Sequence, residues 1–217
     1  GIRLLNGAGF SGEYAFTLAT NANVKLSGNV AASTASINSL ISNGYDITNA
    51  SATITMASAS LAGNILINST NNIAGASTTI GITTFELNIL ATENSTISAI
   101  IGTATTGSLS LGGSGNITLS AANLFTGATN INGATLTYGV SNALSSGGVT
   151  VNGGTYDIGS FNDTVGAVIL QNGTITGSTG VLSGTSYSLR EGTVSAILGG
   201  GIATVTRIAT SAAANSV

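Results

Sequence analysis

The sequence predicts an all-β fold, a parallel β-helix (solenoid) in which each coil takes about 19–20 residues. Short segments with a β-favouring residue between two small polar ones recur 19 or 20 residues apart. Asn-Gly steps stand just before several of these segments, and apolar residues elsewhere come in short alternating runs, which is the pattern of many short strands. The recurring segments are centred on Ile97, Ile117, Leu136, Tyr156, Ile175 and Val194.

Neighbouring side chains in a strand point to opposite faces. The six central residues should therefore stack inward as one column, with their polar flanks outward. The steps Asn132-Gly133, Asn152-Gly153 and Asn172-Gly173 suit the corners of a coil, because Gly and Asn tolerate positive φ. The same dipeptide is typical of a hairpin turn, which would pair strands within about ten residues. The column spacing instead favours pairing one full coil away.

We expect one domain over residues 1–217. Residues 1–30 are expected to cap the solenoid, because a terminal coil exposes an unpaired strand edge. Residues 31–210 are expected to form the coils, and residues 211–217 a tail or a donor segment. Strands are expected in the first part at Ile2–Leu5, Tyr14–Leu18 and Val24–Leu26.

The coils up to residue 91 have a looser pattern, although Ile47, Ile67 and Leu87 stand 20 apart. Two Ala/Ser-rich stretches, 31–40 and 57–62, leave a helical alternative open, although neither has good periodicity or caps. The strands expected here are Ile37–Ile41, Tyr45–Thr48, Thr53–Met56, Asn64–Asn68, Thr79–Thr83 and Phe85–Leu90. Beyond the column, the later half should add Val149–Val151, Val165–Leu170, Val181–Leu182, Tyr187–Leu189, Ala196–Leu198 and Ala203–Ile208.

Composition limits the class of protein. A hydrophobic content of 42% argues against disorder, and no apolar run approaches the roughly 18 residues that a membrane span needs. With only four Lys and Arg and a net charge of −3, a nucleic-acid partner is not expected. The absence of Cys suits an extracellular chain. Because Gly1 replaces an initiating Met, we expect a mature or excised fragment.

The run Leu109–Leu136, with its Leu-Ser-Leu-Gly-Gly-Ser-Gly start and Phe-Thr-Gly-Ala-Thr-Asn-Ile-Asn-Gly-Ala-Thr-Leu end, resembles the passenger-associated repeat of autotransporters. The match covers about residues 95–200, including 149–154 and 185–200. The resemblance implies a right-handed parallel β-helix of the pectin-lyase-like kind, exported to the surface of a bacterium with an outer membrane. It supplies no catalytic site. The run departs from the family pattern at Ala121, Leu124, Phe125 and Ala134.

No catalytic residue, cofactor or metal is predicted. The chain has no His and no Cys, the usual bases and thiol nucleophiles. Asp157 and Asp163 are expected to be solvated loop acids, with a shared calcium site as the alternative. A glycosidase pair at Glu86 and Glu93 is weighed and not favoured. The seven carboxylates are Glu13, Asp46, Glu86, Glu93, Asp157, Asp163 and Glu191.

Two surface patterns bear on binding. The pairs Thr135/Thr137 and Thr174/Thr176 belong to a Thr-x-Thr file that is similar, in this one respect, to the flat arrays of some ice-binding proteins. Thr is also a good exposed strand residue, and the file is interrupted by Asn116, Asp157 and Ser195. An adhesin would need an exposed groove, for which the aromatic candidates are Tyr138, Tyr156 and Phe161. Glycosylation-type tripeptides, interpreted as chance matches, begin at Asn68, Asn94 and Asn116.

The leading hypothesis is a non-enzymatic extracellular structural β-solenoid: a stalk, surface fibre or matrix filament at the cell surface. The expected partner is the protein itself, joined by end-to-end stacking or by strand donation from 211–217 or Gly1–Leu5. The alternatives are an adhesin passenger that binds a host or glycan ligand, an ice-binding protein, and a polysaccharide lyase or hydrolase.

Overall fold

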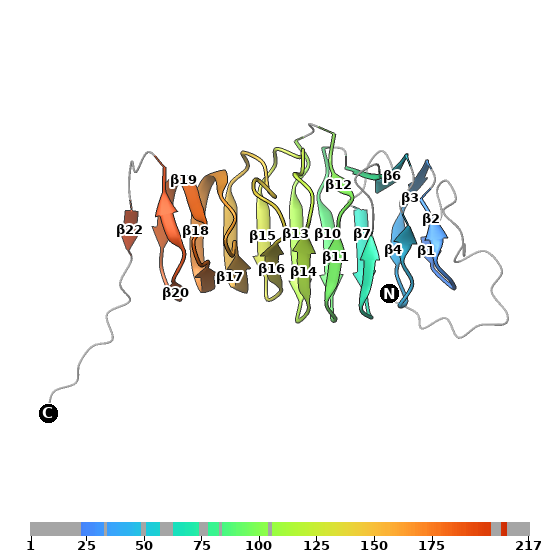
Figure 1. The fold of residues 1–217 in the computed structure, drawn as a ribbon, viewed down its shortest axis with the longest axis horizontal. Helices are drawn as coiled ribbons and strands as arrows, with labels where there is room; N and C mark the ends of the chain where they lie inside the picture. The colour runs from blue at the N-terminus through green and yellow to red at the C-terminus, as the bar shows by residue number, and fades with distance from the viewer. Residues whose placement is uncertain are drawn as a thin grey trace, which may run out of the picture.

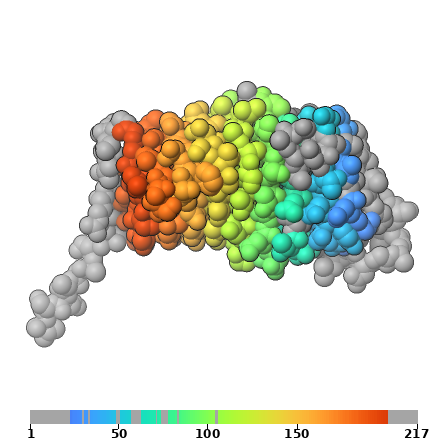
Figure 2. Space-filling model, viewed as in Figure 1, coloured from blue at the N-terminus to red at the C-terminus, as the bar shows by residue number. Residues whose placement is uncertain are grey.

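The fold is a parallel β-solenoid of about eight turns with roughly 20 residues per turn, as predicted (Figure 1). The computed structural model describes residues 23–32, 34–48, 51–56, 63–73, 78–82, 84–103, 106–200 and 205–207. Every regular element within these ranges is a strand. The strands expected at Ile2–Leu5 and Tyr14–Leu18, the stretch 57–62 and the tail 211–217 lie outside the described residues. In Figure 2 the described turns form one elongated body.

Twenty-two strands make up the described turns. They are β1 (Asn23–Lys25), β2 (Val30–Ala31), β3 (Ala35–Ile37), β4 (Ser39–Ile41), β5 (Ile47–Thr48), β6 (Ala52–Met56), β7 (Gly63–Ile67), β8 (Asn71–Ile73), β9 (Thr78–Gly81), β10 (Leu87–Ala91), β11 (Ser95–Ile97), β12 (Ile100–Ile101), β13 (Leu109–Gly113), β14 (Asn116–Leu119), β15 (Thr129–Asn132), β16 (Thr135–Tyr138), β17 (Val149–Asp157), β18 (Asp163–Thr176), β19 (Val181–Leu189), β20 (Thr193–Val194), β21 (Ile197–Gly199) and β22 (Val205–Arg207).

The strands stack on three sides of the solenoid. The first side runs from β1 through β4, β7, β10, β13, β15, β17, β18 and β19 to β22. The second runs from β2 through β5, β8, β11, β14 and β16, then along the C-terminal parts of β17 and β18 to β20. The third contains β3, β6, β9 and β12, and later the start of β18, β19 and β21.

All of these strand pairs are parallel and join different turns, so the hairpin alternative is wrong. Among the described residues the antiparallel contact is an isolated bridge between Gly112 and Gly133, which also joins two turns. The corners carry the predicted chemistry, because Gly133, Gly153 and Gly173 have φ of 84°, 80° and 104°. Gly113, at φ 96°, has no room for a side chain, since a Cβ would lie 2.0 Å from the Ala91 carbonyl oxygen.

The predicted inward column is confirmed for five of its six members. Ile117, Leu136, Tyr156, Ile175 and Val194 pair in register on successive turns. Ile97 was assigned to the wrong column: it pairs with Leu119, and Ser95 lies opposite Ile117. The turn between β11 and β14 takes 22 residues, the difference between 119 and 97, so a count of 20 places Ile97 two residues out of register. Its inward direction is unchanged because a strand has period 2.

The predicted stacking of Ile47, Ile67 and Leu87 is also wrong. Their partners are Ile73, Ala91 and Gly63, which are 26, 24 and 24 residues away by subtraction. These early turns are longer because they hold an extra strand on the third side. All three side chains are nevertheless buried. The helical alternative for residues 31–40 is wrong as well, since β3, β4 and the end of β2 occupy that stretch.

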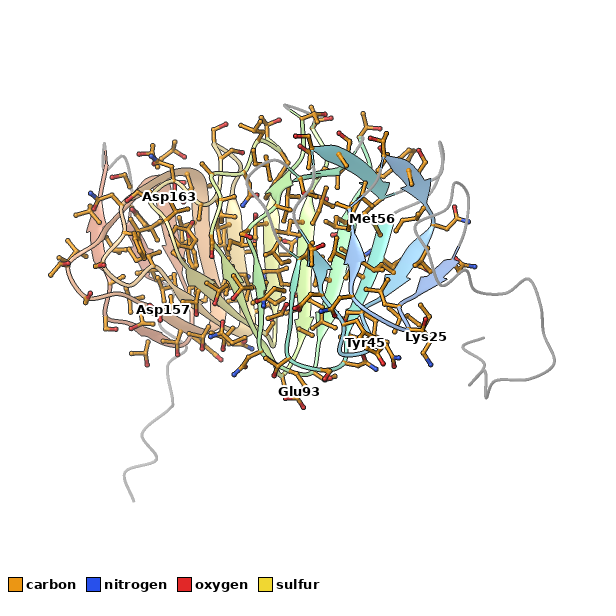
Figure 3. All side chains as sticks on the ribbon, turned by 45° about the vertical axis from the view of Figure 1, so that its right-hand side comes forward. Lys25, Tyr45, Met56, Glu93, Asp157 and Asp163 are labelled. Atoms are coloured by element: carbon orange, nitrogen blue, oxygen red, sulfur yellow. The ribbon has the colours of Figure 1, made fainter. Side chains whose placement is uncertain are left out.

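The core fills the space between the three sides with aliphatic side chains and a few aromatic ones. Figure 3 shows these side chains crowded inside the solenoid. Six polar side chains are also buried among the described residues: Ser42, Thr78, Ser95, Asn123, Thr129 and Asp163.

Candidate functional site

Asp163 is an acidic side chain in the interior, with 2% of its surface exposed. It begins β18 on the third side of the solenoid. On this side the strand β12 ends at Ile101, and residues 120–128 and 139–148 form no strand. The regular ladder resumes where β18 pairs with β19. Buried polar side chains therefore lie where backbone pairing is irregular, and they satisfy the backbone groups that a regular strand would satisfy.

Asn123 is the first of these side chains. The Ile101 N–H donates to its Oδ1 at 2.7 Å, and its Nδ2 donates to the Ala143 carbonyl oxygen at 2.7 Å. The amide thus links three successive turns across the irregular side. The sequence analysis did not identify Asn123, because an Asn in an Asn-rich chain gives no signal that separates a buried bridge from a surface turn.

The Asp163 carboxylate accepts hydrogen bonds from three groups. The Thr164 N–H donates to Oδ1 at 2.6 Å, and the Leu144 N–H donates to Oδ2 at 3.1 Å. The Tyr138 hydroxyl also donates to Oδ2. Leu144 and Tyr138 belong to the preceding turn, so the carboxylate joins two turns.

Tyr156 extends this cluster. Its hydroxyl oxygen lies 2.6 Å from that of Tyr138. Because the single Tyr138 proton is donated to Asp163, Tyr156 must be the donor in the second bond. The two rings meet edge to face, with centroids 5.5 Å apart and planes at 68°. Proton donation therefore runs from Tyr156 through Tyr138 to Asp163.

Burial governs the ionisation of all three groups. It raises the pKa of Asp163, and this rise is opposed by the hydrogen bonds from Tyr138, Leu144 and Thr164. Burial also raises the pKa of Tyr138 well above its usual value, and the charges of Tyr156 and Asp163 raise it further. The pKa of Tyr156 is raised chiefly by burial. The cluster is thus a set of strongly held protons inside an apolar solenoid.

The structure does not bring Asp157 and Asp163 together as calcium ligands. Asp157 ends β17, is half-buried, and accepts a hydrogen bond from the Gly159 N–H at 2.9 Å. Figure 3 shows the two acids on opposite sides of the solenoid. Asp163 is also not the solvated loop acid that was expected. Across the residues placed by the structure, no group of three or more His, Cys, Asp or Glu side chains is arranged to hold a metal.

The glycosidase pair is not formed either. Glu86 and Glu93 flank the five residues of β10, which puts them roughly 20 Å apart at about 3.3 Å per residue. The two carboxyl groups of a glycosidase lie within about 10 Å of each other. The expected aromatic groove is also wrong: Tyr138 and Tyr156 are buried, and Phe161 packs against the core.

The outward Thr residues do form a regular array, which we call the threonine array. One file contains Asn116, Thr135, Thr155, Thr174 and Thr193, and the other contains Thr118, Thr137, Asp157 and Thr176. Both files lie on the second side, in register on successive turns. Hydroxyls also bond between turns: Thr137 donates to Asn116 Oδ1 and Ser195 to Thr176 Oγ1, each at 2.9 Å.

Two of the glycosylation-type Asn side chains take part in inter-turn bonding. The Asn68 Oδ1 accepts from the Asn43 N–H at 2.9 Å, and the Asn94 Oδ1 accepts from the Asn116 N–H at 3.2 Å. These bonds explain both residues as supports for neighbouring turns.

Comparisons with family models, with curated proteins and with solved structures found no match for this chain. The described residues contain no helix long and apolar enough to cross a membrane. The features established for this chain are therefore a parallel β-solenoid, a buried acid with two tyrosines, and a regular polar face.

Proposed function

We propose that this protein is a non-enzymatic extracellular structural β-solenoid, which serves as a stalk, surface fibre or matrix filament of a bacterium with an outer membrane. The observation that carries the proposal is the parallel pairing of strands, one turn apart, from β1 to β22. Such pairing leaves strand edges only at the two ends of a stack, and these edges favour end-to-end contacts. A right-handed winding and an autotransporter-like export route, implied by the sequence resemblance, belong to the same proposal.

The chemistry of the described residues supports a structural role. Asp163, the acid with the most altered environment, is occupied by three hydrogen-bond donors inside the core. The other carboxylates placed in the structure are spread along the solenoid rather than gathered around a common point. A catalytic site needs a base or nucleophile next to a place for substrate, and the geometry of these groups does not favour one.

The test is the assembly state of the purified full chain. We expect electron microscopy to show rods joined end to end, and light scattering to show a mass above the 21.0 kDa of one chain that grows with concentration. Separate single rods at every concentration would contradict the proposed assembly. Labelling of intact cells with an impermeant reagent tests the proposed location, and failure to label would contradict it.

A second candidate function, ice binding, is favoured by the threonine array alone. Its two files repeat along the solenoid at the spacing of adjacent strands, about 4.8 Å. Asp157 interrupts one file and Asn116 ends the other, which weakens the candidate. We expect thermal hysteresis to be reduced in Thr155→Lys and kept in Thr150→Lys, since Thr150 lies on the first side. A chain without hysteresis would eliminate this function.

A further inference from the structure

The apolar core is open at its C-terminal end. Each inward column stays fully buried until its last turn. Ile175 is 0% exposed, but the next residue of its column, Val194, is only partly buried. In the same way Leu182 is 0% exposed, and its partner Leu198 is only partly buried. Ile197, beside Leu198, is 49% exposed.

The N-terminal end differs. Val24, Leu26 and Ile37 belong to the first described turn, and each is 0% exposed. Among the described strands, β1 pairs only with β4 and β3 only with β6. Their inward side chains are nevertheless fully buried. This end therefore has no apolar core surface left to offer to a partner.

Strand edges follow the same direction. Of the strands that the structure places, β20 pairs only with β18 and β21 only with β19. Their other edges face the C-terminal end, which is the red end in Figure 1. An exposed strand edge is a template for pairing with another chain. Residues 193–199 contain no charged side chain, so two copies of this surface would meet without like-charge repulsion between these strands.

We propose that this C-terminal end surface, formed by Val194, Ile197 and Leu198 with the edges of β20 and β21, docks onto the same surface of a second copy. The contact has two-fold symmetry and produces a rod of two solenoids joined tail to tail. This inference rests on the proposed end-to-end assembly and names the end that joins. A head-to-tail contact would instead place the open core against a turn whose apolar side chains are already buried. A two-fold contact closes after two copies, so a longer filament needs a different second contact.

Single cysteines distinguish these arrangements, because the natural chain contains none. Ser195 follows β20 and is exposed, and Ser27 is exposed in the first described turn. We expect Ser195→Cys alone to form covalent dimers with a short bis-maleimide, and Ser27→Cys alone to stay monomeric. The full-length chain is used in both cases.

The other results have separate meanings. Cross-linking that requires an equal mixture of Ser195→Cys and Ser27→Cys would show head-to-tail contacts; it would overturn the tail-to-tail inference and retain the proposed end-to-end function. Cross-linking of Ser27→Cys alone would overturn the inference in favour of the other end. Monomers in every case, with a light-scattering mass of one chain, would overturn both the inference and the proposed function.

Three exposed aliphatic residues provide a matched test. Ile197, Leu90 and Leu124 are 49%, 49% and 48% exposed, but Leu90 and Leu124 belong to turns far from the C-terminal end. We expect Ile197→Lys to weaken dimerisation by about tenfold or more, since a buried charge replaces an apolar contact. Leu90→Lys and Leu124→Lys should leave the dimer mass unchanged, and circular dichroism checks that all three fold. Loss of the dimer in Leu90→Lys but not in Ile197→Lys would identify a lateral contact and overturn the inference.

Discussion

The Tyr138 hydroxyl donates a hydrogen bond to the carboxylate of Asp163, a residue 25 positions further along the chain. This bond crosses from one turn of the solenoid to the next, in a region where the third side has no regular strands. It also fixes the direction of the second bond, because Tyr156 must then donate to Tyr138. The stability of the two turns should therefore depend on the three groups in a definite order.

Removing the middle hydroxyl should cost more than removing the terminal one. Tyr138→Phe takes a donor from Asp163 and the acceptor from Tyr156, so we expect a loss of about 2–3 kcal/mol in the free energy of unfolding. Tyr156→Phe leaves the bond between Tyr138 and Asp163 intact and should cost about 1 kcal/mol. Urea unfolding of the two variants measures both values. Equal costs, or the reverse order, would contradict the direction of donation.

Asp163 should make stability depend on pH in a defined direction. Its pKa is raised in the folded protein by burial, so the folded state holds the proton more tightly than the unfolded chain. The stability from this group is fully present below the unfolded pKa of about 3.9 and is lost as pH rises through the folded pKa. We expect the stability difference between the natural chain and Asp163→Asn to grow as pH falls from 7 toward 4. Asp157→Asn serves as the outer-face control, and a difference that shrinks with acid would refute this assignment.

Asn123 should contribute to stability through one buried amide. Asn123→Leu keeps the size of the side chain but leaves the Ile101 N–H without its acceptor. An unsatisfied buried donor costs about 1–3 kcal/mol, and urea unfolding should show a loss in this range. Asn130→Leu, in a half-buried outward position on β15, is the control and should change stability by less than about 0.5 kcal/mol. Similar losses in both variants would argue against a specific bridging role.

Gly113 should not tolerate a side chain. Its φ of 96° is unfavourable for other residues, and a Cβ would meet the Ala91 carbonyl oxygen at 2.0 Å. We expect Gly113→Ala to lower the free energy of unfolding by about 2–4 kcal/mol through strain and overpacking. Gly28 has no atom within 4 Å of a built Cβ, so Gly28→Ala should stay within about 0.5 kcal/mol of the natural chain. A neutral Gly113→Ala would mean that the corner can rearrange.

The regular half of the solenoid could be predicted because its turn length is nearly constant. Leu136, Tyr156 and Ile175 follow one another at the spacing that the pairing uses. The column failed at Ile97, where the turn is longer. Extra residues in a corner leave the alternation of strand residues intact, so the local pattern shows which side chains point inward but does not show which turn-to-turn partner each one has.

The candidate site could be predicted only in its parts. Tyr156 was placed inward by its position in the column, and burial confirms this. Asp163 was assigned to a loop, because a carboxylate in an apolar stretch is normally solvated. Its burial depends on Tyr138 and Leu144 from the previous turn, and sequence distance gives no sign of that contact.

The sequence by itself determined the class of fold, since small polar and aliphatic residues alternate in segments that repeat with Gly at the corners. The tertiary structure decided the register of the early turns, the inward position of Asp163 and the difference between the two ends. Alternation and corner glycines act within a few residues, so they can be recognised locally. Partner choice and burial are set by residues one turn away, whose distance along the chain varies from turn to turn.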